Sequence, residues 1–409
     1  MTRVILGDIA ISQTGPFGSQ LHEEDYVSEG TPIVTVEHLG DTNFTHQNLP
    51  FVSEADTKRL SKYILIEGDI VFSRVGSIDR NVYVDKNHEG WMFSGRCIRV
   101  RADKNKVNPR YLSYYFKQNS FKKMMMNLAV GATMPSLNTK IMNSIELDLL
   151  PRENQDKIAN ILSAIDDKIQ INNQINQELE AMAKTLYDYW FVQFDFPDQN
   201  GNPYKSSGGK LVYHPELKRE IPEGWGVEKL GDISQYVTEK VDSFELNIEN
   251  YVGTDNMIAD MGGIELTTSI PKSGTSTKFS VGDILISNIR PYFKKIWLSD
   301  RTGGCSADVL CIRTNRIIPK EFVYATLARD DFFNYDVAGS KGSKMPRGDK
   351  KHIMEYPIVF EFEVAEQYSK IVRPIYEAVH ENNNQNQELT KLRDWLLPML
   401  MNGQVKVES

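Results

Sequence analysis

The sequence predicts an α+β protein built from two similar globular halves, each followed by a long helix. Three observations predict this fold class. Several segments recur in the same order at about half the chain length, each half opens with short apolar runs broken by Gly, Pro, Asn and Asp, and each half closes with a long stretch of helical apolar spacing. A chain of 409 residues is also long enough for two or three domains.

The internal repeat rests on five pairs of matching segments, which follow one another in the same order in both halves. They are Leu6–Ile9 with Leu230–Ile233, Lys62–Ser73 with Thr277–Ser287, Cys97–Arg99 with Cys311–Arg313, Gly131–Pro135 with Gly342–Pro346, and Asn176–Leu179 with Asn386–Leu389. One match could arise by chance, but five in order indicate a duplication of the chain.

The first part of each half, residues 1–150 and 225–360, is predicted to be globular. The runs Ile70–Phe72 and Ile284–Ile286 are entirely apolar, which is typical of buried strands. A helix is expected to start near Pro109 in the first half and near Pro319 in the second, because proline is favoured in the first helical turn.

The second part of each half is predicted to be a long helix. No Gly or Pro occurs between Gln155 and Trp190, and apolar residues recur there in steps of three and four. The counterpart runs from about Val364 to Leu396, and its interior Pro374 predicts a kink or a late helix start. The first helix would be roughly 50 Å long. A helix of that length with one apolar stripe needs a partner, and its sister helix is the obvious one.

Amide side chains interrupt both stripes at the same place, in Asn172–Gln177 and Asn382–Gln387. One interpretation is a solvated stretch of helix. The other, which the repetition favours, is pairing of amides across an antiparallel coiled coil, where they fix the register. The predicted domains are 1–150, a spacer helix at 151–196, a polar linker at 197–224, 225–360, and a second spacer helix at 361–402.

Composition places the chain among ordinary globular proteins and limits its chemistry. It is 40% hydrophobic with 25% charged residues, has no apolar run long enough to cross a bilayer, and starts without a signal-like segment, so we expect a cytoplasmic protein without membrane contact. The net charge of −8 is awkward for a DNA-binding protein acting alone, because Lys and Arg supply most non-specific affinity for phosphates.

Motifs for catalysis and cofactor binding are missing from the sequence. There is no phosphate loop, dinucleotide fingerprint, zinc-type spacing, HExxH, GxSxG or methyltransferase-type Asn-Pro-Pro-Tyr motif. We therefore expect no catalytic residue, no metal and no cofactor on this chain. Cys97 and Cys311 lie in apolar strand contexts and are predicted to be core thiols, and the aromatic run between Tyr187 and Phe196 is predicted to pack at a helix end.

Three segments together resemble the specificity subunits of type I restriction-modification enzymes. They are Leu150–Leu162 at the start of the central helix, Trp190–Pro197 at its aromatic end, and Glu220–Trp225 before the second globular part. The resemblance covers essentially the whole chain. It implies two target recognition domains that each read one half of a split site in double-stranded DNA, and an antiparallel coiled coil that spaces them.

The same resemblance implies the partners of the chain. Two modification (methyltransferase) subunits would bind S-adenosylmethionine and methylate adenine, and restriction subunits using ATP and Mg would join them. This chain would carry none of that chemistry. The competing interpretations are a coiled-coil scaffold that binds only protein, and a fused methyltransferase, which the missing motifs oppose.

The loops after the two buried strands are the first candidates for reading DNA, because they are rich in the side chains that bond to base edges or phosphates. The alternative is that such loops are simply solvated. The predicted DNA-binding residues here are Ser73, Arg74, Ser77, Arg80 and Asn81 in the first half, and Ser287, Asn288, Arg290, Tyr292, Lys294 and Lys295 in the second.

A second pair of segments, Gly131–Asn138 and Lys341–Arg347, is the next candidate. Its glycines allow the backbone to approach phosphates, and the second member, with Lys350 and Lys351, is the clearest local basic patch. A charged face beside a helix is the alternative interpretation. The predicted residues are Thr133, Ser136, Asn138, Lys341, Ser343, Lys344 and Arg347. Thr14–Ser19 is a third, weaker candidate.

Overall fold

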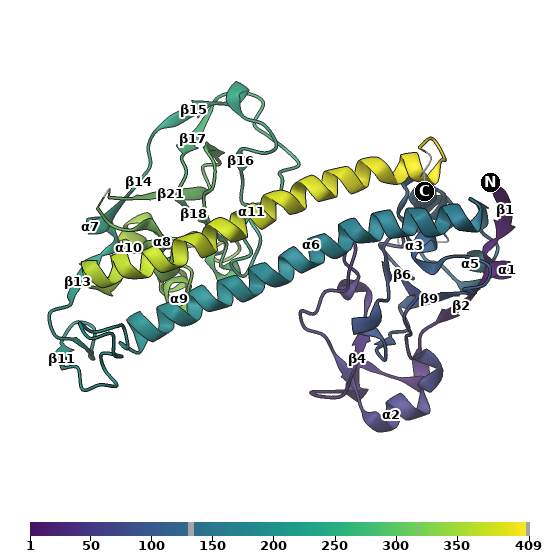
Figure 1. Ribbon diagram of the computed structural model, residues 1–409, viewed down its shortest axis with the longest axis horizontal. Coiled ribbons are helices and arrows are strands. Elements are labelled where there is room, and N and C mark those ends of the chain that lie inside the picture. The colour runs from purple at the N-terminus through teal and green to yellow at the C-terminus, as the bar shows by residue number, and fades with distance from the viewer. Residues whose placement is uncertain (130–134, 316, 406–409) are drawn as a thin grey trace. The chain divides into compact units, whose positions relative to one another are not determined.

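The computed structural model describes residues 1–129, 135–315 and 317–405. The chain divides into two compact units: unit 1 consists of Met1–Ile171 with Gln385–Ser409, and unit 2 of Asn172–Asn384. Unit 1 holds the purple and blue elements of Figure 1, and unit 2 holds the green ones. Among the described residues, no helix is long and apolar enough to cross a membrane.

Unit 1 is built on a four-stranded antiparallel sheet whose central strand, β6, is buried along its whole length. This burial confirms the strand predicted from the run Ile70–Phe72. In order across the sheet the strands are β2 (Ala10–Thr14), β9 (Cys97–Ala102), β6 (Asp69–Ser73) and β7 (Asn81–Tyr83). A second sheet consists of β3 (Tyr26–Val27), β5 (Phe51–Val52), β4 (Thr31–Val34) and β8 (Met92–Phe93), and β1 (Thr2–Ile5) pairs with β10 (Glu146–Leu149).

Short helices complete unit 1. They are α1 (Leu6–Ile9), α2 (Glu54–Arg59), α3 (Pro109–Lys117), α4 (Asn119–Leu128) and α5 (Thr139–Asn143), with 3-10 turns at Gly18–Gln20, Glu23–Asp25, Val36–His38, Ser61–Tyr63 and Lys86–His88. Helix α3 begins at Pro109 as predicted, and the side chain of Asn108 caps it by accepting a hydrogen bond from the backbone N–H of Tyr111 at 3.0 Å.

Unit 2 repeats this architecture, with the same strand order in its main sheet but a different order in its second sheet. Its main sheet consists of β14 (Ser234–Tyr236), β21 (Val309–Thr314), β18 (Ile284–Ser287) and β19 (Ile296–Leu298), and β18 is buried throughout. The second sheet consists of β15 (Lys240–Asp242), β17 (Thr275–Phe279), β20 (Gly303–Cys305) and β16 (Tyr251–Val252), and β13 (Gly226–Lys229) pairs with β22 (Pro357–Phe360). Its helices are α7 (Leu230–Ile233), α8 (Lys320–Leu327), α9 (Asp330–Gly339) and α10 (Lys350–Met354), with 3-10 turns at Ser243–Glu245 and Pro291–Phe293.

One of the five sequence matches is wrong by two residues. The sequence aligned Arg99 with Arg313, but Arg313 bonds to Asp283, directly before β18, whereas the partner of the equivalent Asp69 in β6 is Arg101. The structural counterpart of Arg313 is therefore Arg101. The chain between the paired strands is two residues shorter in unit 2, so the shared Cys-Ile-Arg triplet is a coincidence of composition.

The segment 197–224, predicted as a polar linker, contains a β-hairpin instead. Strands β11 (Leu211–His214) and β12 (Arg219–Pro222) pair antiparallel, and the ring of Tyr204 stacks on that of Phe196 with centroids 4.7 Å apart. Apolar side chains of the segment pack against the main core of unit 2. The few apolar residues among many polar ones therefore decide its structure.

Two long helices, α6 (Arg152–Tyr187) and α11 (Phe362–Met401), confirm the helical prediction. A π-helical turn, η6 (Asp188–Val192), extends α6. Helix α11 begins at Phe362 and continues through Pro374, so of the two alternatives predicted from this proline, a kink or a late start, the late start is wrong. Both dividing points between the units fall within these helices, and each unit contains a part of each helix.

The two helices contact each other within each unit. In unit 2, Asn176 donates a hydrogen bond to Asn383 at 2.9 Å and accepts one from Asn382 at 2.8 Å, which confirms the predicted pairing of amides. In unit 1, Arg393 of α11 forms an ion pair with Asp166 of α6 at 3.0 Å.

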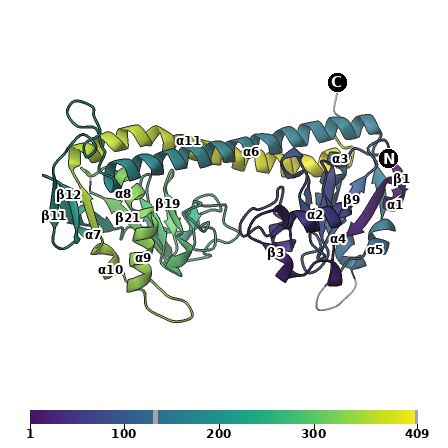
Figure 2. The ribbon, with the colours of Figure 1, turned by 90° about the horizontal axis from the view of Figure 1, so that it is seen from below.

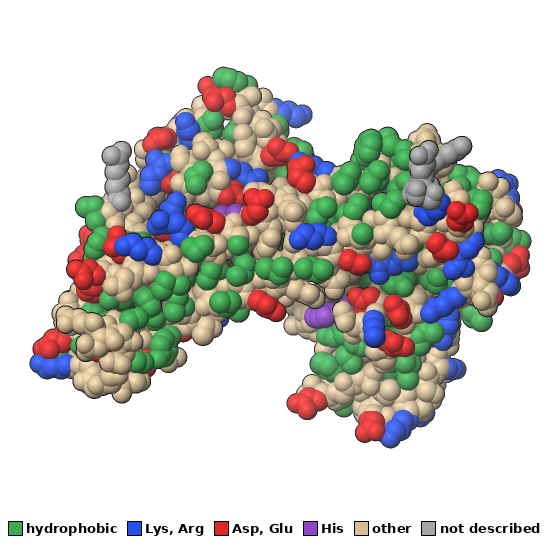
Figure 3. All heavy atoms as spheres, in the orientation of Figure 1, with side chains coloured by type: hydrophobic (Ala, Val, Ile, Leu, Met, Phe, Trp, Pro, Cys, Tyr) green, Lys and Arg blue, Asp and Glu red, His purple; other side chains and the backbone are tan. Residues whose placement is uncertain are grey.

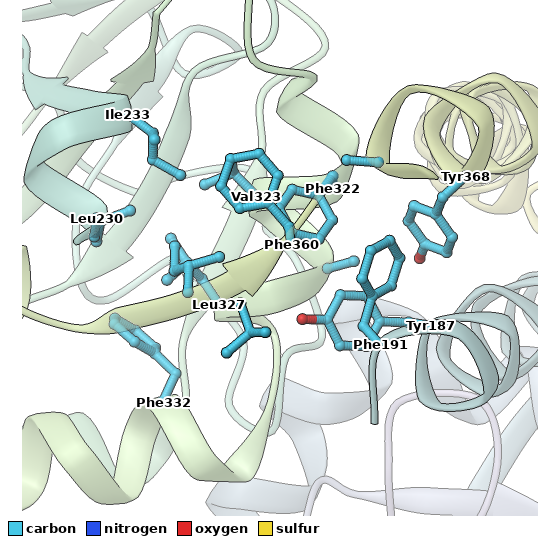
Figure 4. Close-up of a cluster of buried hydrophobic side chains, with 14 of the residues drawn as sticks. Tyr187, Phe191, Leu230, Ile233, Phe322, Val323, Leu327, Phe332, Phe360 and Tyr368 are labelled. Atoms are coloured by element: carbon cyan, nitrogen blue, oxygen red, sulfur yellow. The ribbon is translucent and has the colours of Figure 1, made fainter. Parts of the chain in front are cut away.

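Aromatic residues at the end of α6 form part of the unit 2 core, as predicted. Figure 4 shows Tyr187 and Phe191 facing Phe322 of α8 and Tyr368 of α11. The hydroxyl of Tyr368 also donates a hydrogen bond to the backbone oxygen of Ala183 at 3.2 Å. The cysteines behave as core residues: all three are buried, and burial raises the pKa of the Cys97 thiol to about 12.

Candidate nucleic-acid interface

In unit 1, two of the candidate segments are hydrogen-bonded to each other. The loop Arg74–Arg80 follows β6, and the segment 135–138 precedes α5. The backbone N–H of Gly76 bonds to the oxygen of Pro135 at 3.0 Å, and that of Leu137 bonds to the oxygen of Arg74 at 2.9 Å. These two segments, the paired loops of unit 1, therefore form one surface although the sequence separates them by more than fifty residues.

Unit 2 repeats the arrangement bond for bond. The N–H of Arg290 donates to the oxygen of Pro346 at 2.8 Å, and that of Gly348 donates to the oxygen of Asn288 at 3.2 Å. The paired loops of unit 2 are thus 288–295 and 341–348. Matching hydrogen bonds make Asn288 the counterpart of Arg74, and Arg290 the counterpart of Gly76.

Arg74 is held in place by the backbone of unit 1. Its guanidinium donates hydrogen bonds to the oxygens of Leu137 at 3.3 Å and Gly95 at 3.2 Å, and lies 5.5 Å from the centre of the Phe17 ring. Phe17 is 59% exposed. The third and weakest candidate segment, Thr14–Ser19, therefore reaches the paired loops of unit 1 through Phe17.

Ser77 and Arg80 are exposed in the paired loops of unit 1, whereas Ser136 is half-buried and Asn138 accepts a hydrogen bond from the N–H of Ile141 as the cap of α5. Sequence reasoning missed Arg96, which is exposed and whose backbone oxygen accepts a hydrogen bond from the N–H of Arg74 at 2.8 Å. The signal available was an arginine directly after Gly95, at the start of a strand.

Arg290 and Tyr292 are exposed in the paired loops of unit 2. Arg290 has a left-handed backbone with φ of 51°, and its guanidinium lies 6.0 Å from the centre of the Phe293 ring. Tyr292 packs edge-on against the same ring, with centroids 4.8 Å apart. An exposed guanidinium and exposed aromatic rings thus lie together at one loop.

The basic segment of unit 2 forms a small hairpin, in which Lys341 and Arg347 exchange backbone hydrogen bonds of 2.9 and 3.0 Å. Ser343 and Lys344 lie exposed at its tip. Figure 2 shows this yellow-green hairpin extending past α9 and α10 on the side opposite α11. It presents backbone, hydroxyl and ammonium groups together, which suits contact with phosphates.

Carboxylates partly neutralise the hairpin. Lys341 pairs with Asp349 at 2.6 Å, and Arg347 pairs with Asp308 at 3.0 Å. The hydrogen bond from Lys341, helped by the N–H groups of His352 and Lys351, lowers the pKa of Asp349 to about 2. This aspartate therefore remains ionised over the physiological range. Among the described residues, Lys344 at the tip has no ion pair, unlike Lys341 and Arg347.

Four predicted residues are buried or nearly so, and for the two serines and Asn81 this argues against direct contact with a base. Ser73 and Ser287 donate hydrogen bonds to the oxygens of Val75 and Ile289, so both serines shape the start of a loop. Asn81 and Asn288 are 4% and 8% exposed. Burial follows here from the strands, because Ser73 and Ser287 end β6 and β18 and Asn81 begins β7. The sequence could not distinguish these strand ends from the start of an exposed loop.

Two predicted lysines are engaged within unit 2. Lys294 pairs with Asp330 at 2.6 Å, and the hydrogen bond between them raises the pKa of Lys294. Lys295 donates to the backbone oxygen of Thr254 at 2.7 Å. Thr133, the remaining predicted residue, lies outside the described residues.

Charge is distributed without a single basic surface on the face drawn in Figure 3, where Lys and Arg side chains alternate with Asp and Glu. In the described ranges, no three His, Cys, Asp or Glu side chains are grouped so as to hold a metal ion. The paired loops thus offer hydrogen-bonding groups, aromatic rings and local cations, which are the groups used in contacts with bases and phosphates.

Comparison with known proteins gives concordant results. A family profile described as the type I restriction modification DNA specificity domain matches residues 2–181. The specificity subunit of the type I restriction enzyme MjaIX from Methanocaldococcus jannaschii is 26% identical, over 94% of this chain and 89% of that protein. The HindI specificity subunit from Haemophilus influenzae is 24% identical, over 91% and 95%. A crystal structure of a type I restriction-modification S subunit from M. genitalium shares the fold, with a TM-score of 0.59 at 14% identity over 100% of this chain and 96% of that one.

Proposed function

Because the chain belongs to the family of type I restriction-modification specificity subunits, whose function is sequence-specific DNA recognition, we propose that its two units read the two halves of a split, asymmetric site. The observation that carries this proposal is the paired loops. They recur in both units with the same backbone hydrogen bonds, yet their side chains differ. A repeated frame with different side chains is suited to two half-sites of unlike sequence.

The differences between the paired loops are chemical. Where unit 1 has Arg74, unit 2 has Asn288, and where unit 1 has exposed Arg96, unit 2 has Asp308, as their matching backbone bonds of 2.8 Å show. Arginine favours guanine, asparagine favours adenine, and a carboxylate accepts from cytosine. The two half-sites are therefore expected to differ in base composition.

The long helices are proposed to act as the spacer. Helix α6 has 36 residues and α11 has 40, which correspond to roughly 54 and 60 Å of helix. Half-sites read from the same side of DNA lie about 34–36 Å apart, or a multiple of that distance. The amide contacts between Asn176 and the pair Asn382 and Asn383 would fix the register of an antiparallel coiled coil, and with it the gap in the DNA site.

The helices are also proposed to bind the partner subunits. Several large apolar side chains on them are exposed and are therefore candidates for such contacts. They are Ile171, Ile175 and Met182 on α6, and Ile371, Leu392 and Trp395 on α11. Two methyltransferase subunits would dock here and bring S-adenosylmethionine, restriction subunits would bring ATP and Mg, and this chain would contribute no catalytic residue or cofactor.

An adenine-methylation map tests the proposal. The chain is co-expressed with its methyltransferase subunit in a host that lacks other methylation, and genomic methylation is sequenced. A motif of two unlike half-sites around a gap of fixed length is the expected result. Methylation without such a motif, with assembly verified, would reject split-site reading. Assembly with no methylation and no DNA binding would favour the alternative of a coiled-coil scaffold that binds only protein.

A further inference from the structure

Unit 2 contains a buried carboxylate at a position that is apolar in unit 1. Asp336, on α9, is fully buried, and neither of its carboxylate oxygens has a hydrogen-bond partner among the described residues. Burying such a group without donors is unfavourable. Burial also raises the pKa of Asp336 to about 6. Because burial of this carboxylate is unfavourable and Asp336 lies next to the paired loops, we consider a functional role for it rather than packing alone.

The Asp336 carboxylate lies near the amide of Asn288. A Cβ atom added to Gly348 would lie 2.4 Å from Oδ1 of Asp336 and 2.9 Å from Oδ1 of Asn288, so both oxygens lie close to the same point. The amide oxygen of Asn288 is likewise buried without a partner in the described part of the chain. Gly348 provides the space that this pair of side chains needs, because any larger residue would displace it.

Unit 1 shows what the same positions contain without the pair. Helices α4 and α9 both have ten residues, and the seventh is Met125 in unit 1 and Asp336 in unit 2. Met125 is fully buried. Leu137 donates to Arg74 in the way that Gly348 donates to Asn288. Met125, Arg74 and Leu137 of unit 1 thus correspond to Asp336, Asn288 and Gly348 of unit 2.

We propose that Asp336 orients the amide of Asn288 so that unit 2 recognises a base carrying an exocyclic amino group. Two acceptor oxygens in proximity repel each other, and the amide relieves this by turning its Nδ2 toward Asp336, since its oxygen and nitrogen are nearly equal in shape. The carbonyl oxygen of Asn288 is then directed away from Asp336 and accepts a hydrogen bond. In the major groove, the donors that fit are the amino groups of adenine and cytosine.

This inference rests on the proposed function and assigns Asp336 a positioning role, since it acts through Asn288. It makes a specific demand on the DNA site. One position of the half-site read by unit 2 should require adenine or cytosine, and that requirement should depend on both Asn288 and Asp336. The half-site read by unit 1 should depend on neither.

The test compares methylation maps of the full chain co-expressed with its methyltransferase subunit. The variants are N288A, D336M, which installs the residue of unit 1, and the double variant, with M125L in unit 1 as the matched control. D336M and N288A are each expected to reduce discrimination at one position of one half-site by about tenfold. The double variant should lose no more than N288A alone, because both changes remove the same contact. M125L should leave the motif unchanged.

The outcomes separate this inference from the function on which it rests. A wild-type chain that yields no split motif rejects the proposed function. A split motif that D336M leaves intact, or that D336M relaxes equally in both halves, rejects the role of Asp336 alone. If the losses of discrimination caused by D336M and by N288A add fully in the double variant, the role of Asp336 is rejected as well. Thermal unfolding controls for damage to the fold, because D336M removes a buried charge and should unfold at a higher temperature than the wild type. The base that is selected identifies adenine or cytosine as the ligand.

Discussion

Arg313 donates two hydrogen bonds, of 2.7 and 2.8 Å, to the buried carboxylate of Asp283. Unit 1 contains the same contact between Arg101 and Asp69, with both bonds at 2.7 Å. Each carboxylate also accepts a backbone N–H three residues earlier, from Ser280 in unit 2 and Ile66 in unit 1. This ion pair joins the two central strands of each main sheet and is the structural signature of the repeat.

Removing either aspartate should destabilise its own unit. D283A removes the carboxylate that accepts two hydrogen bonds from Arg313 and one from the N–H of Ser280, and we expect a loss of about 3 kcal/mol in the free energy of unfolding. D69A should have a similar effect in unit 1. Urea unfolding of the purified chain, with fluorescence and circular dichroism as probes, measures both. A loss below about 0.5 kcal/mol, the range of ordinary surface changes, would contradict a supporting role for the pair.

The sequence predicts the large features of this fold well because they depend on long patterns. Helices of 36 and 40 residues leave a long apolar periodicity, and the buried strands β6 and β18 are continuous apolar runs. Alignment of the repeat at Arg313 failed, because a three-residue match outweighed a two-residue length difference. Only the contact with Asp283 identifies the true counterpart, Arg101.

The site was harder to predict because it is assembled by contacts distant in sequence. The two candidate segments of each unit were identified separately, but their hydrogen bonding, as between Gly76 and Pro135, depends on the fold. Asp336 could not be identified at all, since an acid in a short helix usually faces solvent. Its burial becomes evident only when its position is compared with that of Met125.

Asn176 should contribute to register more than to stability. N176L removes the partner shared by Asn382 and Asn383, which should lower the free energy of unfolding by about 1–3 kcal/mol. Replacing all three asparagines with leucine should instead raise the melting temperature, because an apolar contact replaces a polar one while register becomes less specific. Melting curves followed by circular dichroism test this, and a triple variant less stable than N176L would contradict it.

Asp336 should make unit 2 less stable as pH rises. Burial raises its pKa from 3.8 to about 6, so the folded state holds the proton more tightly than the unfolded state does. The unfolded form therefore loses this proton first, and stability falls between about pH 4 and pH 6, with the full cost present above pH 6. The titratable groups that interact electrostatically with Asp336 are His352 on α10 and Tyr236 on β14.

The D336M variant measures this cost directly. It should be more stable than the wild type by at most about 3 kcal/mol at pH 7.5, the figure for a pKa raised from 3.8 to about 6, because the hydrogen bond proposed from Asn288 offsets part of the cost. The part of this advantage that comes from ionisation should disappear below about pH 4, where Asp336 is protonated in both states. Urea unfolding at several pH values gives the comparison, and M125L in unit 1 should show no such dependence. An advantage that does not change between pH 4 and 7.5 would contradict the assignment.

Lys344 and Arg290 should contribute to DNA binding in different ways. Lys344 is exposed at the tip of the basic hairpin and is expected to contact a phosphate, so K344A should weaken binding to all sequences alike. It should also reduce the slope of log affinity against log salt concentration by about 0.9, the value for one phosphate contact.

Arg290 is exposed beside Phe293 and is expected to reach a base edge, so R290A should cost about 1–3 kcal/mol on the specific site and little on unrelated DNA. Fluorescence anisotropy of the complex with its methyltransferase subunit, at several salt concentrations, separates these effects. K210A serves as the control, because Lys210 lies outside the paired loops and is paired with Glu223. If K344A discriminated between sequences while R290A did not, the two roles would have to be exchanged, and the hairpin would be the part of unit 2 that reads bases.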